Sequence, residues 1–268
     1  MANVVINDAH LNDIAAAIRA KNGSADTYKP SEMAAAISAI ENTGGSGGVV
    51  TFADFMARTL QGDISVDCPT IGIYGLACNK NMTSLTSTAT TIETCGCIEC
   101  SKLTTVVMNN LISIGDGAFV DCNKLASIQV PACKTIGEWA FDGCKALQTF
   151  VAPSVETITG MAIFNGCSAL TKIDFTNLSS VSVSAFQGAD NLNTVIIRNT
   201  NAVPTTPGSG PILPDRFRSD STATTKGYIY VPAAMIDAYT SYATTGTGYD
   251  IWSMMNYRAI EDYPEICG

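Results

Sequence analysis

A cysteine that returns at an almost constant interval dominates the middle of this sequence. Its successive copies are 22, 22, 22 and 23 residues apart, and an alanine takes the same place 22 residues after the last one: Cys78, Cys100, Cys122, Cys144, Cys167 and Ala189. A chain that repeats with a period of about 20 to 50 residues folds as stacked copies of one small unit. The spacing therefore predicts a solenoid in which each coil uses one copy of the repeat.

Apolar residues fill the same places in the copies after the first when each cysteine is counted as position 0. Leucine holds +3, apolar residues hold +6 and +8, isoleucine or valine holds +14, and phenylalanine lies near +19. Alternation around +6 and +8 predicts a short strand. The Ile-Gly step near +14 predicts a turn, and segments such as 115–122 (GDGAFVDC) predict a short helix or 3-10 turn. Because one coil cannot bury its own apolar side, we expect stacked coils to share one core. The clearest columns are Leu103, Leu125, Leu147, Leu170 and Leu192, and Phe119, Phe141, Phe164 and Phe186.

The repeat also resembles a known family. Residues 125–136 fit the leucine-rich-repeat frame, and the run of Ile-Gly, Ala-Phe and Cys-x-x-Leu resembles the BspA-like, or Treponema-type, class of these repeats. The resemblance covers about residues 78–200. It implies an α/β repeat solenoid of about 22 residues per coil, each with a short strand and a short helix or 3-10 turn. The first copy departs from the pattern at Asn81 and Cys97, so we interpret it as a transitional coil.

The ends of the chain do not repeat and predict separate segments. We expect a helical hairpin over 1–43, a Gly/Ser linker over 44–48 and a cap over 49–77 with a helix and an edge strand containing Ile64 and Val66. The repeats then run over 78–200. Residues 201–268 are expected to form a C-terminal strand and cap, because the last coil of a solenoid otherwise exposes its core. In that cap, 201–227 is predicted as a loop, 228–232 as a strand and 233–243 as a helix, with Trp252, Tyr257 and Ile260 closing the end.

The hairpin carries a second resemblance. Its sequence IAAAIRAKNGSADTYKPSEMAAAI is similar to an N-terminal module of tail-fibre-like proteins from phages and prophages of Gram-positive gut bacteria. The similarity spans about 30 residues. It implies that residues 1–43 attach the protein or join copies of it into a homo-oligomer, while the downstream part meets the target.

Charge restricts the partners of the chain. With 15 Lys and Arg against 24 Asp and Glu, the net charge is −9, and basic residues form no run. Nucleic acid is a poor partner, because phosphate binding needs Lys and Arg to displace counterions. We expect no membrane insertion either, since no apolar stretch approaches the length of a span. The N-terminus lacks a signal-peptide pattern. We therefore expect synthesis in the cytoplasm, with a place in a virion or phage tail, or alternatively outside the cell.

Candidate chemistry is sparse and has ordinary structural explanations. We interpret the cysteine column as buried packing thiols. For Cys95, Cys97 and Cys100, a disulfide or a zinc site remains an open alternative. The only histidine, His10, lies in the hairpin, far in sequence from any partner for a catalytic triad. The G-x-S-x-G match at 44–48 lies in the linker, the Gly115-x-Gly117 pair lacks a third glycine, and nothing marks Asp174 and Asp190 as an acid–base pair. We expect no catalytic residue, no cofactor and no metal.

The outward positions of the strands are the best candidates for function. At +5 and +7 they place two side chains per coil on one sheet face, and this face is weakly charged and rich in hydroxyl groups. The ten residues are Thr105, Val107, Ser127, Gln129, Thr149, Val151, Lys172, Asp174, Thr194 and Ile196. One interpretation is a solvated sheet whose residues suit a strand. The other is a recognition face for a protein or glycan on a cell surface. The leading hypothesis is a non-enzymatic phage or prophage tail-associated receptor-binding protein, and the alternative is a bacterial cell-surface or secreted BspA-like adhesin.

Overall fold

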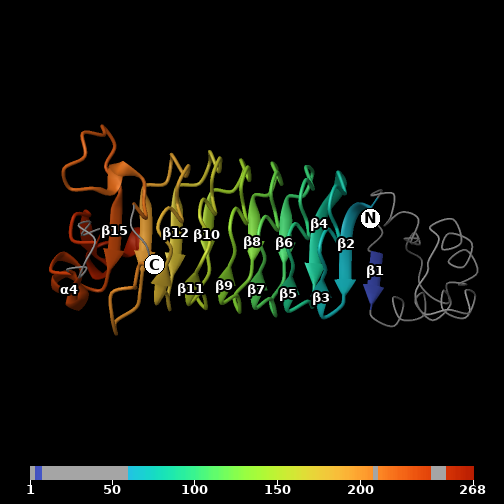
Figure 1. Ribbon diagram of the computed structural model, residues 1–268, viewed down its shortest axis with the longest axis horizontal. Helices are drawn as coiled ribbons and strands as arrows, with labels where there is room; N and C mark the ends of the chain where they lie inside the picture. The colour runs from blue at the N-terminus through green and yellow to red at the C-terminus, as the bar shows by residue number, and fades with distance from the viewer. Residues whose placement is uncertain (1–3, 8–59, 208–210, 243–251) are drawn as a thin grey trace, which may run out of the picture.

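The chain folds into a stack of coils that runs along the long axis of the molecule (Figure 1). The computed structural model describes residues 4–7, 60–207, 211–242 and 252–268. Each repeat contributes one strand to a first column of strands, a two-residue strand to a second column, and a turn segment that leads into the next coil. The expected helical hairpin beyond residue 7, the linker over 44–48, and the cap helix before residue 60 lie outside the described residues.

The first column holds the strands predicted around position +6. All its pairings are parallel, with equivalent positions of successive coils side by side, as in Thr105↔Ser127 and Lys172↔Thr194. Among the described strands the column forms two sheets, which meet without a shared ladder between β8 and β10. The strands are β1 (Val4–Asn7), β2 (Gln61–Asp67), β4 (Asn81–Ser87), β6 (Thr105–Val107) and β8 (Ser127–Gln129), then β10 (Thr149–Val151), β12 (Lys172–Phe175), β14 (Thr194–Ile197), β15 (Tyr228–Val231) and β16 (Tyr257–Ala259).

A second parallel sheet stands where the sequence predicted only a turn. The isoleucine or valine at +14 lies in a two-residue strand, and the turn begins at the residue after it. The expectation missed this sheet because two residues are too short to show a period. Each strand pairs a Ser or Thr, and the apolar residue that follows it, with their equivalents in the next coil. The strands are β3 (Thr70–Ile71), β5 (Thr91–Ile92), β7 (Ser113–Ile114), β9 (Thr135–Ile136), β11 (Thr157–Ile158) and β13 (Ser180–Val181).

The third side of each coil is a stack of turns, so of the two expected forms, a short helix or a 3-10 turn, the helix is wrong. Its backbone N–H groups alternate: Ala118 and Val120 close turns within their own coil, whereas Gly117 and Phe119 donate to carbonyls of the next coil at 2.7 and 2.8 Å. A helix would direct all of these bonds within the segment. Two left-handed residues in every segment, such as Gly117 at φ 61° and Asp121 at φ 56°, also prevent a helix. The described repeat is therefore a β-solenoid.

The core is built from the predicted columns. The leucines at +3 are fully buried from Leu103 to Leu192. The phenylalanines near +19 stack face to face along the axis, with ring centroids 5.4 Å apart for Phe119–Phe141, 5.4 Å for Phe141–Phe164 and 6.0 Å for Phe164–Phe186. Each ring therefore packs on its counterpart in the next coil, and one coil stabilises the next.

The cysteine column is part of the same core. The thiols of Cys122, Cys144 and Cys167 are buried and free, and each donates to a backbone carbonyl of the preceding coil at 3.0–3.2 Å. Cys100 does the same to Leu76 O at 3.1 Å. The column is thus both packing and a weak inter-coil hydrogen bond.

Stacking begins before the first predicted repeat. Residues 60–77 form a coil with β2, β3 and a turn, within the range 49–77 expected to be a cap. The predicted edge strand around Ile64 and Val66 is β2, but it is not an edge, because β1 pairs with its outer side. The buried Asn79 closes this coil by accepting the Leu60 N–H at 3.1 Å and donating to Leu76 O at 2.8 Å.

The C-terminal part continues the stack in less regular form. The segment predicted as a loop over 201–227 runs beside the last repeat, where Thr205 bridges to Ser180, and it contains η1 (Asp215–Phe217). The predicted strand is β15, and the predicted helix is η2 (Ala233–Met235) followed by α4 (Ile236–Thr240). The chain then forms β16, η3 (Ile260–Asp262) and α5 (Pro264–Cys267). Trp252 is buried, as expected of a residue that closes the core.

Candidate binding surfaces

The outer side of the first strand column, here called the strand face, presents two rows of side chains. The register aligns Thr105 with Ser127 and Val107 with Gln129, and it aligns Thr149 and Val151 with the next strand in the same way. Ser127, Gln129, Thr149 and Val151 are exposed, Val151 to 52%, while Thr105 and Val107 are half-buried. These six of the ten predicted residues lie on one open surface over β6, β8 and β10.

The other predicted residues lie under the chain's own C-terminus. Asp174 is only 8% exposed and Ile196 is fully buried, so the expectation that both face outward into solvent is wrong. Lys172 and Thr194 are half-buried. Residues 260–268 cross this part of the strand face and form a small apolar cluster there, made of Ile196, Tyr230 and Cys267 with Tyr228, Ile260, Tyr263 and Ile266 packed against it.

Charged groups fasten this cover. Arg198 donates twice to the Asp174 carboxylate, at 3.0 and 2.7 Å, and also to the backbone carbonyl of Cys267. The Asp174 hydrogen bonds raise the pKa of the Arg198 guanidinium. Lys172 donates to the carbonyl of Ile266. Asp174 and Lys172 therefore hold the C-terminal segment in place, a structural role that the +5 and +7 pattern did not reveal.

The sequence analysis missed a second exposed surface, on the turns. We call the outer side of the turn segments 93–99, 115–121, 137–143 and 159–166 the turn edge. It carries Trp139 and Met161, which are 49% and 42% exposed. Trp139 adopts φ 49°, in the place where the preceding coil has Gly117 at φ 61°. A left-handed conformation costs a bulky L-residue about 1–2 kcal/mol. The signal in the sequence is a large aromatic residue at a turn position whose equivalents in the two preceding coils are Cys95 and Gly117.

The remaining cysteines and polar groups offer no reactive constellation. Cys97 is a buried free thiol and Cys95 a half-buried one. In the part of the chain that the structure describes, no three His, Cys, Asp or Glu side chains lie close enough to hold a metal ion. Asp174 is occupied by Arg198, and Gly115 and Gly117 belong to a turn. His10 and the G-x-S-x-G match lie outside the described residues.

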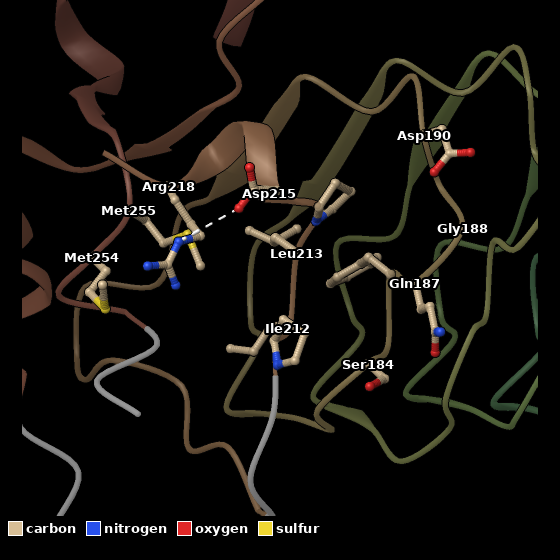
Figure 2. Close-up of a pocket in the computed structure, with 13 residues that line it drawn as sticks. Ser184, Gln187, Gly188, Asp190, Ile212, Leu213, Asp215, Arg218, Met254 and Met255 are labelled. Atoms are coloured by element: carbon tan, nitrogen blue, oxygen red, sulfur yellow. Dashed lines mark ion pairs between the residues drawn. The ribbon is translucent and has the colours of Figure 1, made fainter. Parts of the chain in front are cut away.

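A pocket of about 630 Å³ lies beside the last regular turn. Figure 2 shows Ser184, Gln187 and Asp190 on one side of it, and Arg218 with Met254 and Met255 on the other. Arg218 is already paired, at 2.8 Å to Asp220 and 3.7 Å to Asp215. The floor contains apolar side chains such as Ile212 and Leu213. This pocket can accept an apolar group, and Arg218, the cation among its lining residues, is already paired with two carboxylates.

The geometry of repeating coils agrees with a comparison to protein families. The model of the BspA type leucine rich repeat region matches six copies over residues 67–205. The chain belongs to the BspA-type leucine-rich-repeat family. This family assignment confirms the resemblance found in the repeats. BspA-type repeats are typically found in surface-binding proteins, and their fold is generally a non-enzymatic scaffold.

Two solved structures are similar to this chain. A leucine rich repeat protein of T. pallidum is 26% identical, with a TM-score of 0.38 over 49% of this chain and 57% of that one. This chain thus spans little more than half of the Treponema protein. A leucine rich cell surface protein from Faecalibacterium prausnitzii A2-165 is 14% identical, with a TM-score of 0.38 over 77% of this chain and 81% of that one. No curated protein matches the sequence.

Proposed function

We propose that this BspA-type solenoid is a non-catalytic protein that binds a protein or glycan on a cell surface through the open part of its strand face. The observation that carries the proposal is the continuous exposed patch over Ser127, Gln129, Thr149 and Val151, which the chain's own C-terminus leaves uncovered. Flat, hydroxyl-rich surfaces of stacked repeats serve as extended binding faces. No helix within the described ranges is long and apolar enough to cross a bilayer.

The setting of this binding has two candidate forms. In the first, the chain is a phage or prophage tail-associated receptor-binding protein, and residues 1–43 attach it or join copies of it. That form is supported by the similarity of residues 1–43 to tail-fibre-like modules. In the second, the chain is a bacterial cell-surface or secreted adhesin. That form is supported by the family to which the repeats belong.

A matched pair of variants tests the face. Val151→Arg places a charge in the open strand face, and Ile112→Arg places the same charge on an aliphatic residue of similar exposure, 40%, beside the second sheet. Fluorescently labelled full chain is incubated with intact Gram-positive gut bacteria and, separately, with mammalian epithelial cells, and bound label is counted by flow cytometry. We expect Val151→Arg to lose binding and Ile112→Arg to keep it, with both melting as the unsubstituted protein does.

The two cell types separate the two settings. Binding to the bacteria supports a tail-associated receptor-binding protein, and binding to the epithelial cells supports an adhesin. Gln129→Arg, one coil away on the same face, should repeat the loss caused by Val151→Arg. If both strand-face variants bind either cell type as well as the unsubstituted chain, the strand face is not the binding surface.

A further inference from the structure

Trp139 combines an unfavourable backbone conformation with an exposed aromatic side chain. Its backbone is left-handed, in a slot that Gly117 fills without strain one coil earlier, and half of its side chain faces solvent. Neither feature stabilises the coil. The left-handed backbone itself recurs in this slot, at Tyr74, Cys95, Ala162 and Ser184, so it belongs to the turn. The half-exposed indole is what the turn does not explain, and an exposed tryptophan is a common centre of a protein interface.

The neighbours of Trp139 extend its apolar surface in one direction. Its backbone N–H donates to Met161 O at 3.1 Å, which places the exposed Met161 in the adjacent coil at the same level. On the other side, Gly117 donates to Glu138 O at 2.7 Å and has no side chain to cover the indole. Trp139 and Met161 thus form a small apolar patch that is open on its Gly117 side.

Carboxylates lie in the coil of Trp139 and in the two coils before it. The three turn segments 93–99, 115–121 and 137–143 each contain two acidic residues and no Lys or Arg. Among the described residues, only Glu99 of this set forms an ion pair, with Lys80 at 3.8 Å, and both side chains are about half exposed. Three of the others accept hydrogen bonds: Glu93 from the Ile73 N–H at 3.0 Å, Asp116 from the Glu138 N–H at 2.8 Å, and Asp142 from the Asn165 amide at 2.8 Å. The six are Glu93, Glu99, Asp116, Asp121, Glu138 and Asp142.

We propose that the turn edge docks a cationic segment of a partner protein, with an Arg or Lys over the Trp139 ring and an aliphatic residue against Met161. A guanidinium over an indole face gains from the ring's quadrupole, and exposed tryptophans are common centres of protein interfaces. The six carboxylates favour a cationic partner over an anionic glycan or nucleic acid, which they would repel. This edge is separate from the strand face, so the two surfaces can be occupied independently.

The chain offers an internal reference for the test, because its two tryptophans differ in exposure. Trp139 is half exposed and Trp252 is buried. The probe is a short peptide of alternating Arg and Leu, with a Glu and Leu peptide of equal length as its control. We expect the Arg peptide to protect one tryptophan from acrylamide quenching, and the Glu peptide to protect none. Protection by the Glu peptide or by neutral mannan oligosaccharide overturns the proposal. Protection that rises with protein concentration when no peptide is present also overturns it.

Variants locate the site. Trp139→Gly should weaken binding of a fluorescein-labelled Arg peptide about tenfold, as measured by anisotropy, and should leave the melting temperature unchanged or higher because glycine accepts the left-handed backbone. Asp121→Asn with Glu138→Gln should weaken it by about threefold at low salt. The matched control, Asp237→Asn with Glu265→Gln, removes two exposed carboxylates far from the turn edge in sequence and should have no effect. Unchanged affinity in Trp139→Gly, or a clearly lower melting temperature, overturns the proposal. Val151→Arg should leave peptide binding intact, so failure here is distinguishable from failure of the strand face.

Discussion

Raising the pH above about 8.5 should destabilise this protein, because its repeats bury thiols that must stay protonated. Burial raises the pKa of the Cys133 and Cys167 thiols to about 12. It also raises the pKa of Cys97, Cys122 and Cys144 well above the ordinary range. In an unfolded chain a cysteine has a pKa of about 8.5. The unfolded chain therefore releases protons that the folded chain keeps.

The magnitude follows from these pKa values. The folded pKa lies above the unfolded one, so each thiol's stabilisation is complete below about pH 8.5 and is lost as the pH rises toward 12. By about pH 10, Cys133 and Cys167 each lower the free energy of unfolding by about 2 kcal/mol. Together they remove about 4 kcal/mol, which is a large part of the stability of many domains. Cys97, Cys122 and Cys144 act in the same direction.

Urea unfolding followed by circular dichroism, in the presence of a reductant, measures this loss between about pH 7 and about pH 10. Tyrosines ionise near the upper limit, so a variant isolates the thiols. Cys133→Val with Cys167→Ala should be less stable than the unsubstituted protein at neutral pH, yet lose about 4 kcal/mol less by about pH 10. A free energy of unfolding that does not fall with pH, or an equal loss in both proteins, would refute burial of these thiols.

Three further changes test other parts of the fold by urea unfolding. Phe141→Ala removes the ring that stacks on both neighbours at 5.4 Å and should cost about 4 kcal/mol, and a cost below about 1 kcal/mol would contradict the continuous stack. Gly160→Ala places a Cβ 2.4 Å from the Glu138 backbone N and should prevent tight stacking of that coil, whereas normal stability would show that the coils can separate there. Arg198→Met strands the covered Asp174 carboxylate and should cost about 2 kcal/mol, with earlier cleavage of residues 260–268 in limited proteolysis; an uncleaved segment would show that apolar contacts alone hold it.

The sequence predicts the repeat well because each apolar column is read several times. A leucine at +3 in five consecutive copies allows only one alignment of the coils, and all five leucines are buried in the structure. The two-residue second sheet and the turn stack were harder to foresee, because their bonds run between coils and local sequence does not encode them. The two glycines and two aspartates of GDGAFVDC already disfavour a helix, but the bonds from Gly117 and Phe119 to the next coil leave no signal in the local sequence.

The candidate surface divides for a similar reason. The alternation at +5 and +7 correctly places side chains on the outer side of the strands, and for Gln129 and Val151 this means solvent. Asp174 and Ile196 also lie on the outer side, but residues 260–268 cover them there. Nothing local to β12 or β14 indicates that a segment about 70 residues later in the chain returns to cover them.

Departures from a column carry more information than the column itself, and they separate into two kinds. Some are explained by a contact within the chain. Asp174 accepts a hydrogen bond from Arg198, and Asn79 accepts one from the Leu60 N–H. Such departures are consequences of the fold, because the contact within the chain is enough to explain why the residue differs from its column. Trp139 is the other kind. Its left-handed backbone belongs to the turn, as at Cys95 and Ala162, but its side chain is half exposed and the described residues do not account for that exposed surface. We therefore expect the Trp139 ring to contact a partner outside this chain.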